Sequence, residues 1–90
     1  MVQTKVLVDN ERVKVFEVRI PPGEKLPRHT HPAYVAYAMN SAKVKITFPD
    51  GTSATRELVK GNASYSEGVT HEIENIGSTE LINLEIELKG

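Results

Sequence analysis

Apolar and polar residues alternate with a period of two along much of the chain, which is typical of β-strands that bury one face. Residues 44–48 alternate valine, isoleucine and phenylalanine with lysine and threonine. Residues 82–88 alternate isoleucine and leucine with asparagine and glutamate, and a helical stripe in this segment would match fewer apolar positions. Both segments are therefore predicted to be strands.

Two other segments are less regular. Residues 13–20 also alternate, but the apolar positions change parity between Val15 and Phe16. This change predicts a bulge or a strand that is buried on both faces. Residues 33–39 contain three alanines and also suit a helix. We interpret them as a strand that is joined to the next one near residues 40–41.

Turn-forming residues cut these segments short at intervals of roughly eight to twelve residues. Residues 49–52, 61–62 and 67–68 carry glycine together with asparagine, aspartate or glutamate, and residues 21–27 contain three prolines that suit a surface loop. No amphipathic helix separates the strands. The pattern therefore predicts an all-β antiparallel sandwich or barrel rather than βαβ units.

Length and composition restrict the classes of function. The 90 residues suit one domain, residues 1–90. Eleven basic and twelve acidic residues give a net charge of −1 without a basic cluster, so no nucleic-acid partner is expected. No apolar run is long enough for a membrane span, and no secretory signal is recognisable, so we expect a cytoplasmic protein. The absence of cysteine excludes disulfides and thiolate metal sites.

The chain has three histidines, His29, His31 and His71. On a strand, the first two project from one face with Cα atoms about 6.5 Å apart, close enough to share a metal ion. His71 follows a turn and shares its parity with Ile73 and Asn75, which predicts that it points into the same core. An exposed His-x-His pair and a hydrogen-bonded core histidine are the competing interpretations.

Two separated motifs resemble those of the cupin superfamily. The first is a glycine, five residues and His-x-His, which here reads Gly23-EKLPR-His29-Thr-His31. The second reads Gly61-NASYSEGVT-His71-EIE-Asn75, although serine replaces its usual proline and the spacing is one residue short. The resemblance implies a small antiparallel double-stranded β-helix, also called a jelly roll. It also implies that the three histidines bind a divalent metal ion.

Within the superfamily, the chain is most similar to small single-domain bacterial cupins, including those of the beta-alanine degradation protein type. This narrower resemblance depends on residues 9–13, 34–35 and 71–75. The first cupin motif usually continues to a glutamate ligand, but Val35 and Ala36 occupy those positions, and no acidic residue occurs between Glu24 and Asp50. The predicted site is therefore a neutral three-histidine site, which leaves about three positions open on an octahedral ion.

Other polar residues are weaker candidates. Tyr34 or Tyr37 can supply a phenol as general acid, hydrogen-bond donor or weak ligand, although packing in the barrel is the simpler role for each. The resemblance makes Asn75 structural. Three further residues are considered and not favoured, namely Glu67 as a substitute ligand and Arg28 and Arg56 as substrate-carboxylate binders.

Three functions remain open at this point. The first is a dioxygenase-like metalloenzyme that acts on a small polar chelating molecule through iron, manganese, nickel, zinc or copper. The second is a non-catalytic cupin that binds a small molecule or a metal, and the third is a metal-free interaction module. We also expect a homodimer that pairs through exposed strand edges, with residues 2–8 and 81–88 as the candidate edges.

Overall fold

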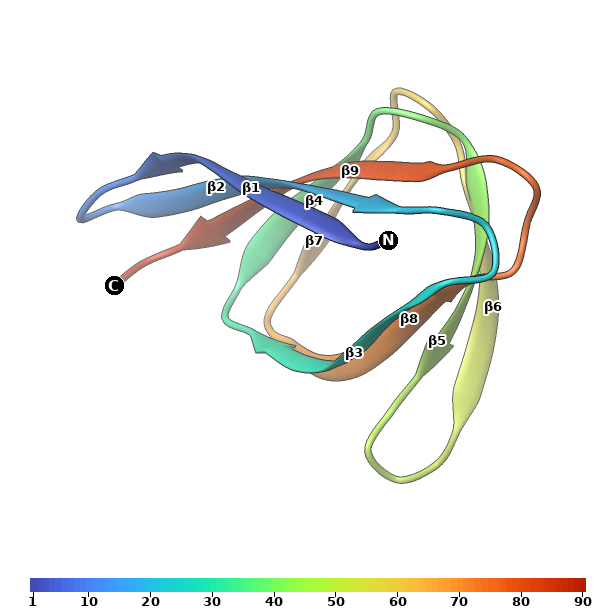
Figure 1. Ribbon diagram of the computed structural model, residues 1–90. Coiled ribbons are helices and arrows are strands. Elements are labelled where there is room, and N and C mark those ends of the chain that lie inside the picture. The colour runs from blue at the N-terminus through green and yellow to red at the C-terminus, as the bar shows by residue number, and fades with distance from the viewer.

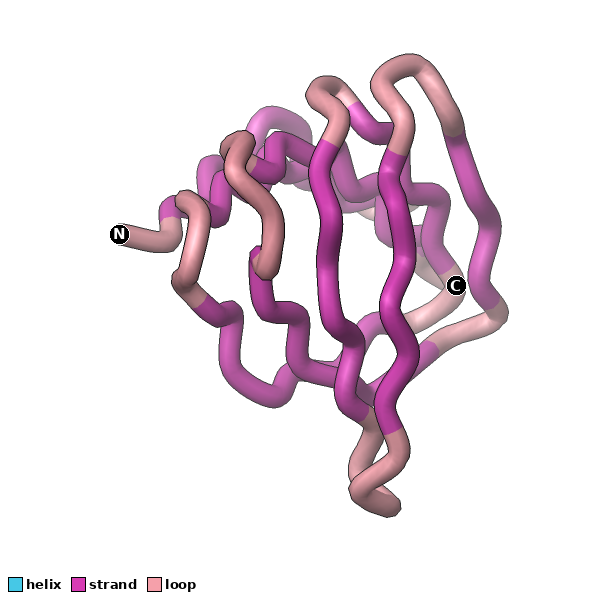
Figure 2. Tube along the Cα trace, turned by 90° about the vertical axis from the view of Figure 1, so that its right-hand side faces the viewer, coloured by secondary structure: helices cyan, strands magenta, loops and turns pink.

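The computed structural model describes residues 1–90 and consists of nine strands. Figure 2 shows strands and loops and no helix. The predicted all-β class is therefore confirmed, and no helix is present that could cross a membrane. The strands are β1 (Gln3–Asp9), β2 (Val13–Ile20), β3 (Lys25–His31), β4 (Tyr34–Ala38), β5 (Ala42–Thr47), β6 (Ser53–Leu58), β7 (Ala63–Ser66), β8 (Val69–Asn75) and β9 (Leu81–Leu88).

The strands form two sheets that face each other, with the orders β1-β2-β9-β4-β7 and β3-β8-β5-β6 (Figure 1). Every pairing is antiparallel, and β2 pairs with β9, β3 with β8, β4 with β7, and β5 with β6. This nested order is that of one long hairpin wrapped around a common core. It is the double-stranded β-helix, or jelly roll, that the motifs imply.

Most of the irregular segments follow the sequence-based predictions. The register between β1 and β2 shifts between Val6 and Val8, so the bulge lies on β1, opposite Val15 and Phe16, and not within residues 13–20 as predicted. Strand β2 itself is continuous and carries apolar residues on both faces. The alanine-rich segment is β4 and not a helix. The prediction of a surface loop through residues 21–27 was only partly right, because β3 already begins at Lys25.

The apolar core lies at one end of the space between the sheets. It consists of five buried side chains, Val18, Ile20, Ala42, Val44 and Leu81. These come from β2, β5 and β9, so both sheets contribute to it. The other end of the interior contains polar side chains instead, including His31, His71 and Glu85.

Strand β9 lies between β2 and β4 in the middle of its sheet, so the expectation that residues 81–88 form an exposed edge was wrong. Its inward-facing residues after Leu81 are polar, with Asn83 and Glu85 buried. The isoleucines and leucines at the alternate positions, Ile82, Leu84, Ile86 and Leu88, therefore face outward. The edge strands of this sheet are β1 and β7.

Asn75 is fully buried and connects three backbone segments. Its Nδ2 donates to the carbonyl oxygens of Ile20 and Thr79, each at 2.8 Å. Its Oδ1 accepts a hydrogen bond of 3.0 Å from the backbone N–H of Gly77. The side chain thereby fixes the end of β8 against the end of β2 and the turn before β9.

We expect Asn75→Ala to lower the free energy of unfolding by about 3 kcal/mol, because two carbonyl groups and one N–H lose their partner in a buried region. Urea denaturation followed by circular dichroism measures the change. Asn62→Ala is the matched control, since Asn62 is exposed and its side chain makes no hydrogen bond. Equal stability of the two variants would contradict the structural role of Asn75.

Candidate metal centre

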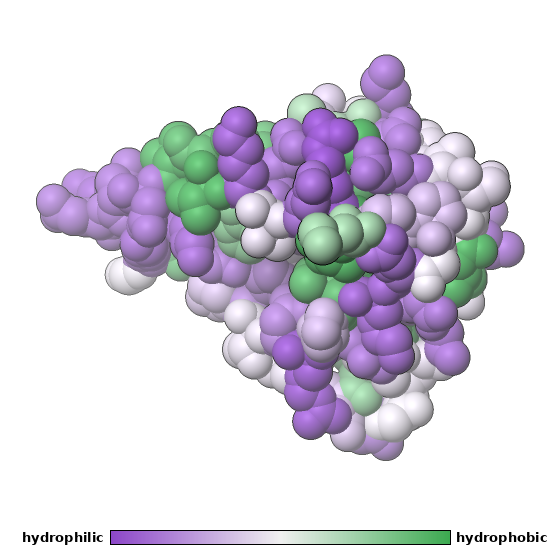
Figure 3. Space-filling view, in the orientation of Figure 1, coloured by the Kyte–Doolittle hydropathy of each residue, from purple (hydrophilic) through white to green (hydrophobic).

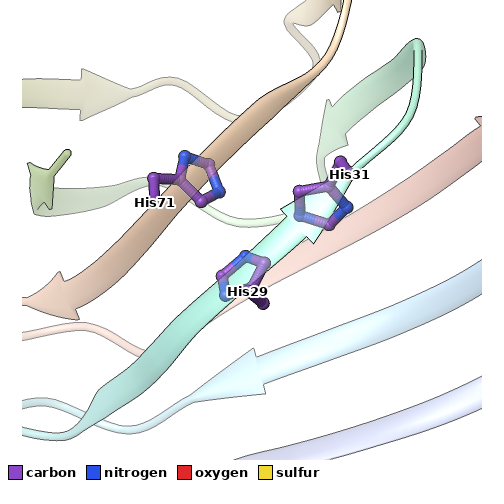
Figure 4. Close-up of side chains that lie close together, drawn as sticks. All are labelled: His29, His31 and His71. Carbon is purple, nitrogen blue, oxygen red and sulfur yellow. The ribbon is translucent and has the colours of Figure 1, made fainter. Parts of the chain in front are cut away.

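The three histidines meet on the inner face of the sheet that contains β3 and β8. The antiparallel register makes His29 and His71 direct Cα partners, and His31 lies two residues after His29 on the same face. The ring centroid of His29 lies 4.7 Å from the centroid of His31 and 4.7 Å from that of His71. The centroids of His31 and His71 are 5.4 Å apart. Figure 4 shows the three rings gathered across the two strands.

Hydrogen bonds fix the orientation of two of the rings. Nδ1 of His29 lies 2.7 Å from the carbonyl oxygen of Pro27, and Nδ1 of His31 lies 2.6 Å from Oε2 of Glu87. Because a carbonyl oxygen only accepts, Nδ1 of His29 must carry the proton, and a carboxylate favours the same tautomer for His31. Each ring therefore presents its Nε2 lone pair away from its anchor.

The free ring nitrogens suit a metal ion. Nε2 of His29, His31 and His71 is buried in each case and has no hydrogen-bond partner. One ring nitrogen of each residue lies within 4.8 Å of those of the other two. Nitrogens that share one ion at about 2.1 Å are roughly 3.0 to 3.4 Å apart. Small side-chain rotations are therefore enough to bring all three to one ion.

The environment favours the neutral imidazoles that coordinate metals. Burial, followed by the neighbouring His29 and His31, lowers the pKa of His71 to about 4. Burial also lowers the pKa of His29, and the carbonyl oxygen of Pro27 opposes that effect in part. A neutral imidazole has its lone pair available, so both residues are competent ligands near neutral pH.

A glycine allows the turn before His71 to approach His31 closely. Gly68 has a φ of +132°, and a Cβ built there would lie 3.2 Å from the carbonyl oxygen of His31. Gly68, the second glycine of the second motif, thus allows β8 to lie beside the end of β3. Ser66, which replaces the usual proline, and the shorter spacing after Gly61 leave this contact intact.

Of the two candidate tyrosines, only Tyr34 lies at the histidines. Its ring stacks on that of His31 with centroids 4.4 Å apart, and Phe16 stacks on His31 at 6.2 Å. Burial, followed by Glu85 and Glu87, raises the pKa of Tyr34 to about 12, so its phenol keeps its proton. Tyr37 is 39% exposed on the opposite face of β4 and cannot reach the site.

The remaining candidates lie away from the centre. Glu67 is exposed and accepts a hydrogen bond of 3.4 Å from the hydroxyl of Tyr65. Arg28 and Arg56 are both exposed and form no ion pair. The structure therefore gives none of these three residues a place at the histidines.

Sequence reasoning missed two carboxylates on β9. Glu87 accepts the hydrogen bond from His31, and Glu85 is 4% exposed and lies opposite Ala36 on β4. Both share the parity of Leu81, which the structure shows to be buried. The sequence alone did not identify this face as the inner one, because four apolar residues alternate on the other face of β9.

Glu85 has no partner for its charge. Burial, followed by the nearby carboxylate of Glu87, raises the pKa of Glu85 to about 7. Its Oε2 is buried without a hydrogen bond. The inner face of β9 thus brings a second, unpaired acid close to the residue that anchors His31.

The chain is similar to proteins of one family along nearly its whole length. No protein-family model matches it. It is 34% identical over 86 residues to the Beta-alanine degradation protein BauB of Pseudomonas aeruginosa, a match that covers 93% of this chain and 90% of that protein.

Solved structures agree with this relationship. A cupin domain from Bordetella pertussis Tohama I superposes with a TM-score of 0.91 at 38% identity, over 99% of this chain and 94% of that one. An RmlC-like cupin family protein with a double-stranded β-helix fold from Methanocaldococcus jannaschii has a TM-score of 0.79 at 22% identity, over 99% and 81%. The second likeness concerns the fold alone.

The raised pKa of Glu85, from an ordinary 4.5 to about 7, predicts a pH-dependent loss of stability. The stabilising effect of the protonated acid is complete below about pH 4.5 and is lost as the pH rises through 7. Glu85→Gln does not ionise and avoids this loss. In metal-free protein, we therefore expect the unfolding free energy of the variant relative to wild type to increase between pH 4.5 and 7.5.

Urea denaturation of both proteins at several pH values measures this difference. The lowered pKa of His71 makes the free energy of unfolding rise with pH in part of this range, which is the opposite trend. This contribution is the same in both proteins, so it cancels in their difference. Glu11→Gln, at an exposed position without an ion pair, is the control and should follow wild type. A difference that is constant with pH would show that Glu85 ionises normally in the folded protein.

Proposed function

The chain belongs to the cupin superfamily, and from this premise we propose that it binds one divalent transition-metal ion through His29, His31 and His71. We further propose that it is a dioxygenase-like metalloenzyme for a small chelating molecule. The observation that supports the proposal most directly is the convergence of three buried Nε2 atoms without any partner. Buried polar groups are nearly always paired, so three together indicate a missing ligand.

The protein's own residues would prepare such a centre. A bound ion would supply a Lewis acid with open positions for a chelating oxygen anion or dioxygen. Glu87 holds the proton on Nδ1 of His31, which keeps Nε2 directed inward and makes it a stronger donor. Tyr34 covers the ring of His31 and keeps its phenolic proton, so its hydroxyl would serve as a hydrogen-bond donor to a ligand held at this site.

The substrate class follows from the neutral ligand set. Three imidazoles leave the full charge on the ion, which favours anionic chelators such as a diketone enolate or a small oxo acid or amino acid. The relative named for beta-alanine degradation supports a small amino acid or its product. The metal is iron, manganese, nickel, zinc or copper, all of which imidazole ligands accommodate.

Two other functions remain candidates on the same geometry. A non-catalytic metal-binding or small-molecule-binding cupin needs the same three ligands and no turnover. A metal-free interaction module would use the histidines as core polar groups, which the unpaired Nε2 atoms disfavour.

We expect purified wild-type protein to contain about one transition-metal ion per chain by elemental mass spectrometry, because three preformed imidazole ligands bind such ions tightly. The double variant His29→Ala, His71→Ala should contain essentially none. Thr30→Ala lies on the same strand, where its hydroxyl contacts Thr70 at an exposed position, and serves as the control.

Protein that stays empty after metal is added back would contradict the metal site and favour the interaction module. Given a loaded protein, oxygen uptake with small chelating acids and diketones separates the two metal-dependent functions. Consumption of oxygen supports the enzyme, and binding without consumption supports the non-catalytic cupin.

We also propose that the protein acts as a homodimer in the cytoplasm. The fold needs no oxidising compartment, since it has no cysteine. One row of five apolar residues crosses the outer face of the larger sheet from edge to edge, in the register Val8, Val15, Ile86, Val35 and Tyr65. Figure 3 shows an apolar patch, in green, in the region of β1 and β2, where Val6, Leu7 and Val8 are exposed.

This apolar row replaces the pairing of backbone edges as the proposed contact. No other segment of the chain packs over the outer face in Figure 1, and Tyr65 is 58% exposed. An apolar row on the outer face of a sheet can pack against the same row of a second copy related by a two-fold axis. A second copy of the chain is therefore the partner that fits it.

Light scattering after gel filtration tests the homodimer. We expect wild type at twice the 10.0 kDa of the chain. The double variant Val8→Glu, Tyr65→Glu should be monomeric, because dimerisation would bury two unpaired charges in each copy. Val59→Glu changes an exposed apolar residue outside the row and should remain dimeric. Monomeric wild type at micromolar concentration would rule out the dimer.

A further inference from the structure

Five buried side-chain atoms of the protein lack a hydrogen-bond partner, and the three histidine Nε2 atoms account for only three of them. The other two are Oδ1 of Asn83 and Oε2 of Glu85. Both residues are more than nine-tenths buried, at 7% and 4% exposed. They lie two residues apart on β9 and therefore project from the same inner face.

The register places Glu85 and Asn83 at successive positions along β9, each further from the histidines than the one before. Glu87 pairs with Tyr34 on β4 at the level of His31. Glu85 pairs with Ala36 one step further, and Asn83 pairs with Ala38 at the next step. Each step along a strand pair is about 6.5 Å. Glu85 is therefore one step, and Asn83 two steps, from the level of His31 along β9.

Small side chains leave space beside this face. A pocket of about 230 Å³ is lined by Asn83 of β9, by both alanines of β4 and by residues of β6 and β7, including Leu58 and Ser64. This volume is below the range of drug-sized sites and suits a small metabolite. On β9, Glu85 lies between Asn83, which lines this pocket, and Glu87, which accepts the hydrogen bond from His31.

The interior supplies no cation to neutralise Glu85. The buried residues include no lysine and no arginine. Lys14 lies with its Nζ 5.7 Å from the ring centroid of Phe16 and forms no ion pair. A buried carboxylate without a counter-charge is costly, and a cationic ligand group removes that cost. A neutral hydroxyl group would satisfy the hydrogen bond but not the charge.

We propose that Glu85 and Asn83 form a subsite for the ammonium group of a substrate whose anionic oxygens bind at the three histidines. The proposal rests on the metal-dependent function given above and narrows its substrate class from small anionic chelators to those that carry an ammonium group, the small amino acids. Glu85 supplies the counter-charge, and the amide oxygen of Asn83 accepts a further hydrogen bond. Both act as substrate-positioning residues.

Calorimetric titration of zinc-loaded protein with paired ligands tests the subsite. The pairs are 3-aminopropanoate with propanoate and 4-aminobutanoate with butanoate, which differ only in the amine. We expect wild type to bind the better amino acid at least about tenfold more tightly than its partner, as one charge-assisted hydrogen bond provides. Glu85→Gln should lose this preference and keep its affinity for zinc within about twofold.

Glu57→Gln is the matched control, because Glu57 is an exposed carboxylate that lines the same pocket. This variant should retain the preference for the amine. Equal binding of both ligands by wild type, or a preference that survives Glu85→Gln, would overturn the subsite. Loss of the preference in Glu57→Gln alone would also overturn it, by placing the amine at the pocket mouth.

A loss of zinc affinity of tenfold or more in Glu85→Gln, with both ligands weakened equally, would show that Glu85 serves the metal and not the substrate. If the protein binds no metal, the proposed function fails, and the subsite is tested separately by titrating metal-free protein with propylammonium. A shift of the Asn83 side-chain amide resonance that is absent with propanoate supports the subsite. The lack of any shift overturns it, whether or not Glu85→Gln folds.

Discussion

The antiparallel register between β3 and β8 is the constraint on which the candidate site depends. It makes His29 and His71 direct partners and places His31 on the same face. The close approach at Gly68 and the buried network of Asn75 hold the two ends of β8 in this position. A slip of one residue would turn His71 to the opposite face and separate it from the other two histidines.

Strand β9 carries the second half of the interior. It is central in its sheet, yet its inner face after Leu81 is polar and its outer face is apolar. This reversal gives the barrel a carboxylate that orients His31, and another that lacks a partner. The same reversal leaves an apolar surface on the outside. One alternation in the sequence thus underlies both the proposed chemistry and the proposed assembly.

The sequence predicted much of the fold because alternation and turns are local signals, and the two motifs fixed the positions of all three histidines. It could not predict the face of β9, since alternation defines two faces without saying which one is buried. It also mistook that strand for an edge, because strand order depends on pairings between distant segments. The role of Glu87 became visible only when β9 was placed beside β4, where Glu87 pairs with Tyr34.

The nested pairing of the strands also has a consequence for the order of folding. Strand β2, near the start of the chain, pairs along its whole length with β9, near the end. The larger sheet therefore cannot close during synthesis until residue 88 has been made, and its formation requires contacts between distant segments, which makes folding slow. A nascent chain that lacks β9 would contain all three histidines without the carboxylate that orients His31. The carboxylate that orients His31 is therefore the last part of the candidate site to be synthesised.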